Sequence, residues 1–175
     1  MLCKKLHHAA YRCRDARETA DFYTGMLGLK LSHIVGGDHV PSTGLYSPHA
    51  HLFFELEDGS SIAFFECPQD PGNMKDMESP DWIQHFAFEV ENEAALLDAM
   101  ARLVDAGIKV VGPTDHDFLL SIYFFDPSGH RLELTVRTEH DPEALGRFAA
   151  EAPRLLALWE QTHDWSLRDN PADVR

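Results

Sequence analysis

Two histidines and one glutamate have residue types and positions that suit a metal site. His8 lies in the stretch LHHAAYRC, His85 in IQHFAFEV and Glu133 in RLELTV, and each stretch is typical of a β-strand. Two imidazoles and a carboxylate that converge from three strands form a facial arrangement. Such a site binds Fe(II), Mn(II) or similar divalent ions and leaves positions open for a substrate and a small molecule.

Side-chain parity agrees with this interpretation, because successive residues of a strand point to opposite faces. In IQHFAFEV the phenylalanines share one face, so His85 takes the other. In RLELTV the leucines and the valine share one face, and Glu133 takes the other. A lone strand histidine is more often a half-buried structural residue. The duplication of the pattern along the chain favours metal ligation here.

The elements that must position these residues occur twice. Helices are predicted over residues 16–28 and 94–107, where Asp and Asn caps precede them and glycines end them. Hairpins are predicted over 51–67 and 121–136, and the Gly-, Pro- and Ser-containing segment 34–50 is predicted to be a long loop.

An offset of 77 residues places His8 on His85, so the chain contains an internal repeat. Matching the last strands, SIAFFEC with GHRLELT, makes Glu66 the expected counterpart of Glu133. The predicted fold class is therefore α+β, with two tandem βαβββ modules that form a metal-binding cleft, followed by a helical extension. The expected bounds are 1–137 for the single domain, about 4–68 and 81–137 for its modules, and 138–175 for the extension and tail.

Composition limits the partners of the chain. Its 175 residues carry 15 basic and 29 acidic side chains, a formal charge of −14, which disfavours nucleic acid and anionic membranes as partners. No apolar run approaches the length of a membrane span, and the start has no signal-peptide core, so a cytoplasmic protein is expected.

A helix is also expected from Asp141 to Thr162, and residues 166–175 are expected to form a loose tail. The apolar side of that helix, which includes Trp159, needs a surface on this domain or on a second copy. A homodimer is thus one expected state.

The stretches HHAAYRCRD, FYTGMLGLKL, HFAFEV and SIYFFDPSGHRLELT resemble the vicinal oxygen chelate superfamily over about residues 4–137. This superfamily includes type I extradiol dioxygenases, glyoxalase I and antibiotic-resistance proteins built from paired βαβββ units. The resemblance implies that His8, His85 and Glu133 occupy the shared ligand positions. It also implies a small-molecule substrate whose two adjacent oxygens chelate the metal.

The leading hypothesis is an extradiol-dioxygenase-like enzyme that uses Fe(II). Tyr123 lies ten residues before Glu133 and Asp117 six before Tyr123, which is similar to the spacing in those dioxygenases. There the tyrosine hydrogen-bonds the substrate oxygen at iron. Their additional acid–base histidine has no counterpart between Cys67 and Gln84.

Two alternatives remain open. A glyoxalase-like lyase or isomerase would use Glu66 as a fourth ligand and base, on Mn, Ni or Zn as well as Fe. A metal-free binding protein would hold a small molecule in the same cleft. Arg12 shares the parity of His8, so it can hold an anionic substrate group or pair with an acid such as Glu89, and Asp117 is a second candidate for substrate binding.

Overall fold

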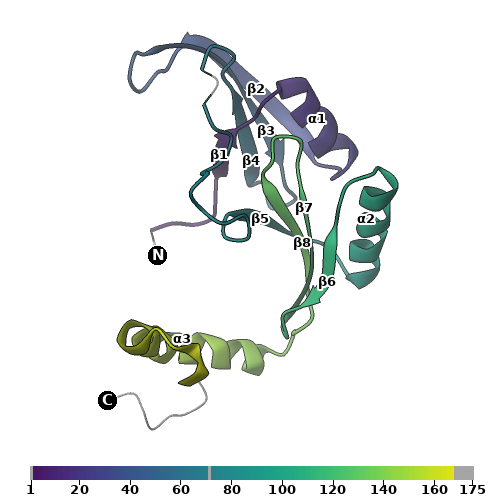
Figure 1. Ribbon diagram of the computed structural model, residues 1–175, viewed down its shortest axis with the longest axis vertical. Coiled ribbons are helices and arrows are strands. Elements are labelled where there is room, and N and C mark those ends of the chain that lie inside the picture. The colour runs from purple at the N-terminus through teal and green to yellow at the C-terminus, as the bar shows by residue number, and fades with distance from the viewer. Residues whose placement is uncertain (1, 71, 168–175) are drawn as a thin grey trace.

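The computed structural model describes residues 2–70 and 72–167, in which two similar modules follow each other along the chain (Figure 1). Module 1 consists of β1 (His8–Arg12), α1 (Ala16–Gly25), β2 (Lys30–His39), β3 (Tyr46–Glu55) and β4 (Ser61–Glu66). Module 2 consists of β5 (His85–Glu89), α2 (Glu93–Asp105), β6 (Val111–Asp115), β7 (Leu119–Phe125) and β8 (Arg131–Arg137). The α+β class with two βαβββ modules, predicted from the repeat, is confirmed.

Each module forms its own four-stranded sheet. The strand order is β1-β4-β3-β2 in sheet 1 and β5-β8-β7-β6 in sheet 2, so the first strand of each module pairs in parallel with the last. The apolar residues of alternate strand positions pack against α1 or α2, and the two helices lie on the same side of the molecule (Figure 1). The face of each sheet away from its helix is here called the outer face.

The segment predicted to be a loop over residues 34–50 is largely β-strand, so that prediction is wrong. β2 and β3 form an antiparallel pair in which His33 lies opposite Phe53 and Gly36 opposite Ala50. A Cβ at Gly36 would lie 2.6 Å from the carbonyl oxygen of His49. The glycine therefore permits close approach of the two strands, which is a strand role for a residue type that usually indicates a loop.

The two modules share one hydrophobic core. Phe22 of α1 contacts Phe124 of β7, and the fully buried Tyr23 donates its hydroxyl hydrogen to Asp126 Oδ2 at 3.1 Å. His130, which is also buried, lies with Nε2 2.7 Å from the carbonyl oxygen of Arg12. Contacts between α1 and the turn from β7 to β8 thus fix the position of module 2 against module 1.

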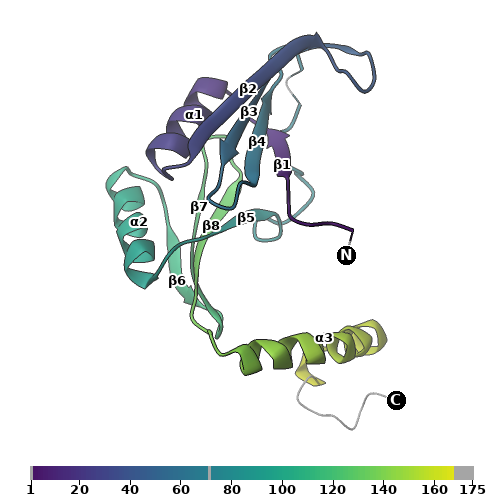
Figure 2. The same cartoon turned by 180° about the vertical axis from the view of Figure 1, so that it is seen from behind.

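The predicted C-terminal helix is confirmed as α3 (Pro142–Thr162), and a short 3-10 turn, η1 (Trp165–Leu167), follows it. Figures 1 and 2 show α3 extending away from both sheets. It begins beside the turn between β6 and β7, where Phe148 contacts Phe118, and its Leu156 and Trp159 are exposed. No helix among residues 2–70 and 72–167 is both long and apolar enough to cross a membrane. The predicted tail lies mostly outside the described residues.

Candidate functional site

His85 and Glu133 meet on the outer face of sheet 2. They come from the neighbouring strands β5 and β8, and Nε2 of His85 lies 3.0 Å from Oε2 of Glu133. Glu133 is almost fully buried, with 7% of its side chain exposed, whereas His85 remains accessible. The pair on which the metal prediction depends is therefore in contact.

The hydrogen bonds of this pair are compatible with a cation held between its two members. Nδ1 of His85 lies 3.2 Å from the carbonyl oxygen of Ile83, which can only accept, and Nε2 faces the carboxylate of Glu133, which also accepts. A neutral imidazole has a single N–H, so when Nδ1 donates to Ile83, Nε2 presents its lone pair toward Glu133, and a metal ion can bind between Nε2 and the carboxylate. Two ligands at right angles, each about 2.1 Å from an ion, lie about 3.0 Å apart. The two ligand atoms, Nε2 of His85 and Oε2 of Glu133, therefore fit a divalent metal. Nδ1 of His85 is held by a carbonyl, as in most metal-binding histidines.

Tyr123 and His116 extend this pair into a chain of hydrogen bonds. The hydroxyl of Tyr123 donates to Oε1 of Glu133 at 3.2 Å, and Nε2 of His116 lies 2.7 Å from the same hydroxyl. Because the hydroxyl has one hydrogen, His116 donates its Nε2 hydrogen to the tyrosine oxygen. Burial, followed by the charge of Glu133, raises the pKa of Tyr123. The hydroxyl is therefore neutral at pH 7 and fixed in direction.

The turn between β6 and β7 positions His116. Its backbone N–H donates to Leu119, and Asp117 follows with φ of 69°, a left-handed conformation. Thr138 donates its hydroxyl hydrogen to the carbonyl oxygen of Asp117. Asp117, expected to be a substrate-binding residue, thus shapes the turn that holds His116. No spacing in the sequence singled out His116, because its contact with Tyr123 depends on this turn.

The structure leaves His8 apart from the pair on module 2. His8 lies on the outer face of sheet 1, with Nδ1 2.8 Å from Nδ1 of His7 and its ring against His51 and Phe53. Within the part of the chain that the structure describes, no group of three or more His, Cys, Asp or Glu residues is arranged to hold a metal ion. One chain therefore brings together two of the three predicted ligands.

Glu66 is not the counterpart of Glu133, contrary to the sequence match. In the strand registers His8 lies opposite Ser61 and His85 opposite Arg131, so the residue two further along β4, Ala63, corresponds to Glu133. Glu66 instead lies on the helix side of sheet 1, where it accepts a hydrogen bond from Ala16 N at 3.3 Å. Glu66 lies three residues past Ala63, and a shift by an odd number of residues moves a strand side chain to the opposite face, which explains the error.

Arg12 is engaged with an acid other than the one considered from the sequence. Its guanidinium forms an ion pair with Asp70 at 3.0 Å and also donates to the carbonyl oxygen of Asp70. Asp70 belongs to the segment that connects β4 with β5. The structure thus uses Arg12 to fasten this connection against β1.

Four histidines, His33, His39, His49 and His51, lie on β2 and β3. His51 is 8% exposed and stacks on Phe65, and its Nε2 has no hydrogen-bond partner among the described residues. Burial, with smaller contributions from His8, His49 and His33, lowers the pKa of His51 to about 4. This imidazole is therefore neutral at pH 7.

Comparison with known proteins agrees with this geometry. The family model described as Glyoxalase/Bleomycin resistance protein/Dioxygenase superfamily matches residues 5–134. A glyoxalase family protein from Enterococcus faecalis is 26% identical, with a TM-score of 0.58, and the match covers 77% of this chain and 99% of that one. A glyoxylase/bleomycin resistance protein/dioxygenase domain from Frankia sp. EAN1pec is 22% identical, with a TM-score of 0.62. The match covers 77% of this chain and 98% of that one.

A third structure shares the fold at lower identity. TnmS3, an antibiotic binding protein from Streptomyces sp. CB03234, is 18% identical, with a TM-score of 0.55 and coverage of 79% and 99%. The fold is thus found in binding proteins as well as in proteins named for enzymes. The match over residues 5–134 and the two βαβββ modules together confirm the resemblance seen in the sequence. The chain belongs to the glyoxalase/bleomycin resistance protein/dioxygenase superfamily.

Proposed function

We propose that the chain is a metal-dependent enzyme that acts on a small molecule with two adjacent oxygens, in the manner of an extradiol dioxygenase. The observation that supports this proposal is the chain of hydrogen bonds from His85 through Glu133 and Tyr123 to His116. A divalent ion held by His85 and Glu133, with Fe(II) favoured, would act as a Lewis acid toward both substrate oxygens.

The residues around the ligands have distinct roles in this proposal. The neutral hydroxyl of Tyr123 faces the ligand pair, and its remaining lone pair can accept a hydrogen bond from a substrate hydroxyl placed there. His116 donates to the tyrosine oxygen and so holds the hydroxyl in one direction. The burial of Glu133 keeps water away from its carboxylate and strengthens the interactions made there.

The register of sheet 1 favours a three-ligand site over a four-ligand one. Ala63 occupies the position in module 1 that corresponds to Glu133, and it supplies no donor atom. A glyoxalase-like site with a second glutamate at this position is therefore disfavoured. Three protein ligands leave three positions of an octahedral ion for the substrate and a small molecule, as a dioxygenase requires.

We also propose that His8 reaches the site from a second copy of the chain. The trio is not assembled within one chain, and His8 and His85 both lie accessible on outer faces that a second copy can cover. Exposed apolar side chains on α3 add surface that a dimer would bury. In a symmetric dimer each site would combine His8 of one copy with His85 and Glu133 of the other.

The metal proposal is tested by anaerobic reconstitution of chelator-treated protein with Fe(II), Mn(II), Ni(II) or Zn(II). One ion per chain is expected, and His85→Ala should lose it, whereas His39→Ala, a change on β2 beside Tyr46, should not. Oxygen uptake with catechols would support ring cleavage. Turnover of 2-oxoaldehyde adducts without oxygen uptake would contradict the dioxygenase-like reaction.

Mixing two inactive variants tests the origin of His8. If the site is shared between copies, refolding His8→Ala together with His85→Ala should restore metal to about one site in four, because half of the dimers are mixed and each mixed dimer has one intact site. If each chain builds its own site, the mixture binds no more metal than the separate variants. That result would contradict the dimer proposal and leave the metal proposal standing.

A further inference from the structure

Among the described residues of this strongly acidic protein, Arg131 forms no ion pair with an acidic side chain. It lies directly opposite His85 in the pairing of β5 with β8, two residues before Glu133. Its guanidinium stacks over the ring of Tyr123 at 4.2 Å. No carboxylate lies within 4 Å of it among residues 2–70 and 72–167.

The stacking leaves the guanidinium able to bind an anion. Arg131 places one face of its planar group on the tyrosine ring, while its N–H groups point outward from the edges of the plane. Planar guanidinium groups bind carboxylates through two parallel hydrogen bonds. Arg131 is only partly exposed, so such a bond would form away from the full screening of bulk water.

A cavity of about 180 Å³ lies beside Arg131 at the edge of sheet 2. Aromatic and aliphatic side chains of Tyr11, Ile83 and Phe86 form part of its wall, and Gln84 adds an amide. A cavity of about 150 Å³ holds a benzene molecule in another protein. The cavity therefore has room for a single aromatic ring, and its wall can pack against the faces of that ring.

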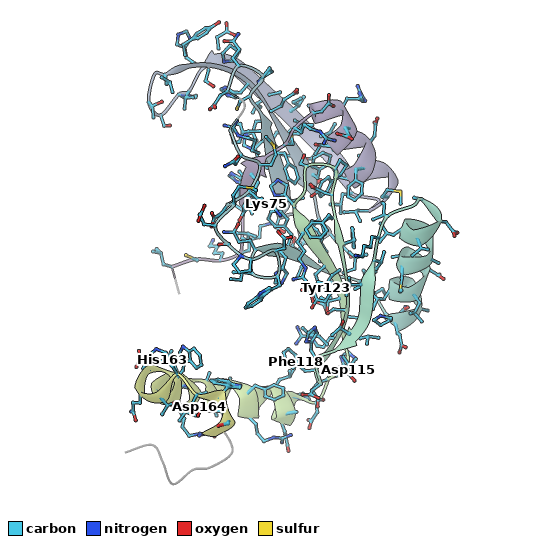
Figure 3. All side chains as sticks on the ribbon, in the orientation of Figure 1. Lys75, Asp115, Phe118, Tyr123, His163 and Asp164 are labelled. Atoms are coloured by element: carbon cyan, nitrogen blue, oxygen red, sulfur yellow. The ribbon has the colours of Figure 1, made fainter. Side chains whose placement is uncertain are left out.

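Lys75 adds a second positive charge to the cavity. Its ammonium group lies above the ring of Phe125 at 5.4 Å and is paired with Asp81 of the same connecting segment. Figure 3 labels Lys75 in the segment before β5 and Tyr123 on β7, a strand of the same sheet as β5. His85 lines the same cavity, so a ligand bound there lies next to the proposed metal ligands.

From this juxtaposition we infer that the cavity binds a monocyclic aromatic carboxylate, with the carboxylate on Arg131 and the ring packed against Tyr11 and Phe86, which contact each other in the cavity wall. The inference deepens the proposed function, on which it rests only for the claim that this ligand is the substrate. The substrate class would then be an aromatic acid whose ring also carries two adjacent oxygens. The sequence suggested that Arg12 holds an anionic substrate group. Because Arg12 is paired with Asp70, Arg131 has this role in the present inference.

The test uses the full-length, chelator-treated protein, so that it does not depend on a metal. Benzoate is the probe and benzamide its neutral isostere, and binding is measured by calorimetry or ligand-observed NMR. Benzoate is expected to bind at least tenfold more tightly than benzamide. Arg131→Met should reduce benzoate affinity at least tenfold and leave benzamide affinity unchanged. Arg137→Met, on the same face and strand but at the far end beside Glu89, is the matched control and should bind benzoate as the wild type does.

Several outcomes would overturn the inference. These are equal affinities for benzoate and benzamide, an unchanged benzoate affinity in Arg131→Met, or an equal loss in Arg137→Met. If Arg131→Met does not fold, the side-chain amide signals of Gln84 in the wild-type protein decide, since they should shift with benzoate and not with benzamide. If the wild-type protein binds no metal but binds benzoate more tightly than benzamide, the result contradicts the proposed function alone. If it binds metal but shows no preference for benzoate over benzamide, the result contradicts the carboxylate site alone.

Discussion

Replacing Tyr23 with phenylalanine removes one hydroxyl from the joint between the modules. Tyr23 is fully buried, and its hydroxyl donates to Oδ2 of Asp126 at 3.1 Å. The other carboxylate oxygen accepts the backbone N–H of His130 at 2.8 Å. Burial raises the pKa of Asp126, so this carboxylate depends on its few hydrogen-bond donors. Tyr23→Phe therefore leaves one buried carboxylate oxygen without its donor.

The expected loss follows from the kind of hydrogen bond. A bond to a charged group contributes about 1.5–3 kcal/mol, and Tyr23→Phe should lower the free energy of unfolding by that amount. Asp126→Asn should change it by less than about 1 kcal/mol at pH 7, because an amide keeps one acceptor for His130, gains a donor for the tyrosine oxygen and removes a buried charge.

The pH dependence has a definite sign. Because the pKa of Asp126 is higher in the folded protein than its ordinary value of 3.8, the folded state binds this proton more tightly. The contribution of Asp126 to stability is therefore full below pH 3.8 and is lost as the pH rises through the raised pKa. Asp126→Asn lacks this loss, so its stability relative to the wild type should increase from pH 4 to pH 7.

Urea unfolding of the metal-free protein measures these effects. Tyr46→Phe, which removes the hydroxyl of a tyrosine that is 60% exposed, is the control and should have the wild-type midpoint. The double variant Tyr23→Phe/Asp126→Asn should lose less than the sum of the single losses, since both changes act on one hydrogen bond. The reasoning is refuted if Tyr23→Phe has the same midpoint as Tyr46→Phe.

Four further changes should have separable effects. Tyr123→Phe should fold and bind metal but lose about 10²- to 10⁴-fold in turnover once a substrate is known, whereas His116→Phe should lose less, because the hydroxyl remains. Normal turnover in Tyr123→Phe would show that Tyr123 serves packing and not turnover. Since the pKa of His51 is lowered to about 4, the urea midpoint should fall as the pH decreases from about 6.5 to 4, and His51→Phe should show a smaller fall. Truncation after Arg137 should lower the melting temperature or change the elution volume, and if neither changes, α3 contributes nothing to stability or assembly.

The sequence was most informative where strand alternation decided the outcome. The alternation in IQHFAFEV and RLELTV placed His85 and Glu133 on one face, and the structure has them 3.0 Å apart. Tyr123, singled out by its spacing from Glu133, donates to that carboxylate in the structure. Alternation works here because a strand with one buried face has only one register that keeps its apolar residues in the core.

Other features depended on geometry that residue types do not specify. Similar residues near the ends of β4 and β8 suggested Glu66 as the counterpart of Glu133. In the hydrogen-bond register of the strands the counterpart is Ala63. His116 reaches Tyr123 only because Asp117, the next residue, adopts a left-handed conformation in the turn between β6 and β7. How the modules are oriented determines whether His8 approaches His85, and this orientation is set by contacts such as Tyr23 with Asp126, which no local pattern predicts.

The parallel pairing of β1 with β4 also bears on the order in which the nascent chain folds. Sheet 1 cannot close until Ser61, the partner of His8, has left the ribosome, but from then on module 1 has all its strands. Asp126 follows Glu66 at a distance that takes several seconds to translate at roughly 5–20 residues per second. During those seconds Tyr23 has no partner for its hydroxyl, and the surface that module 2 later covers is open to water. A translational pause once Cys67 has left the ribosome should therefore produce the nascent species most dependent on a chaperone.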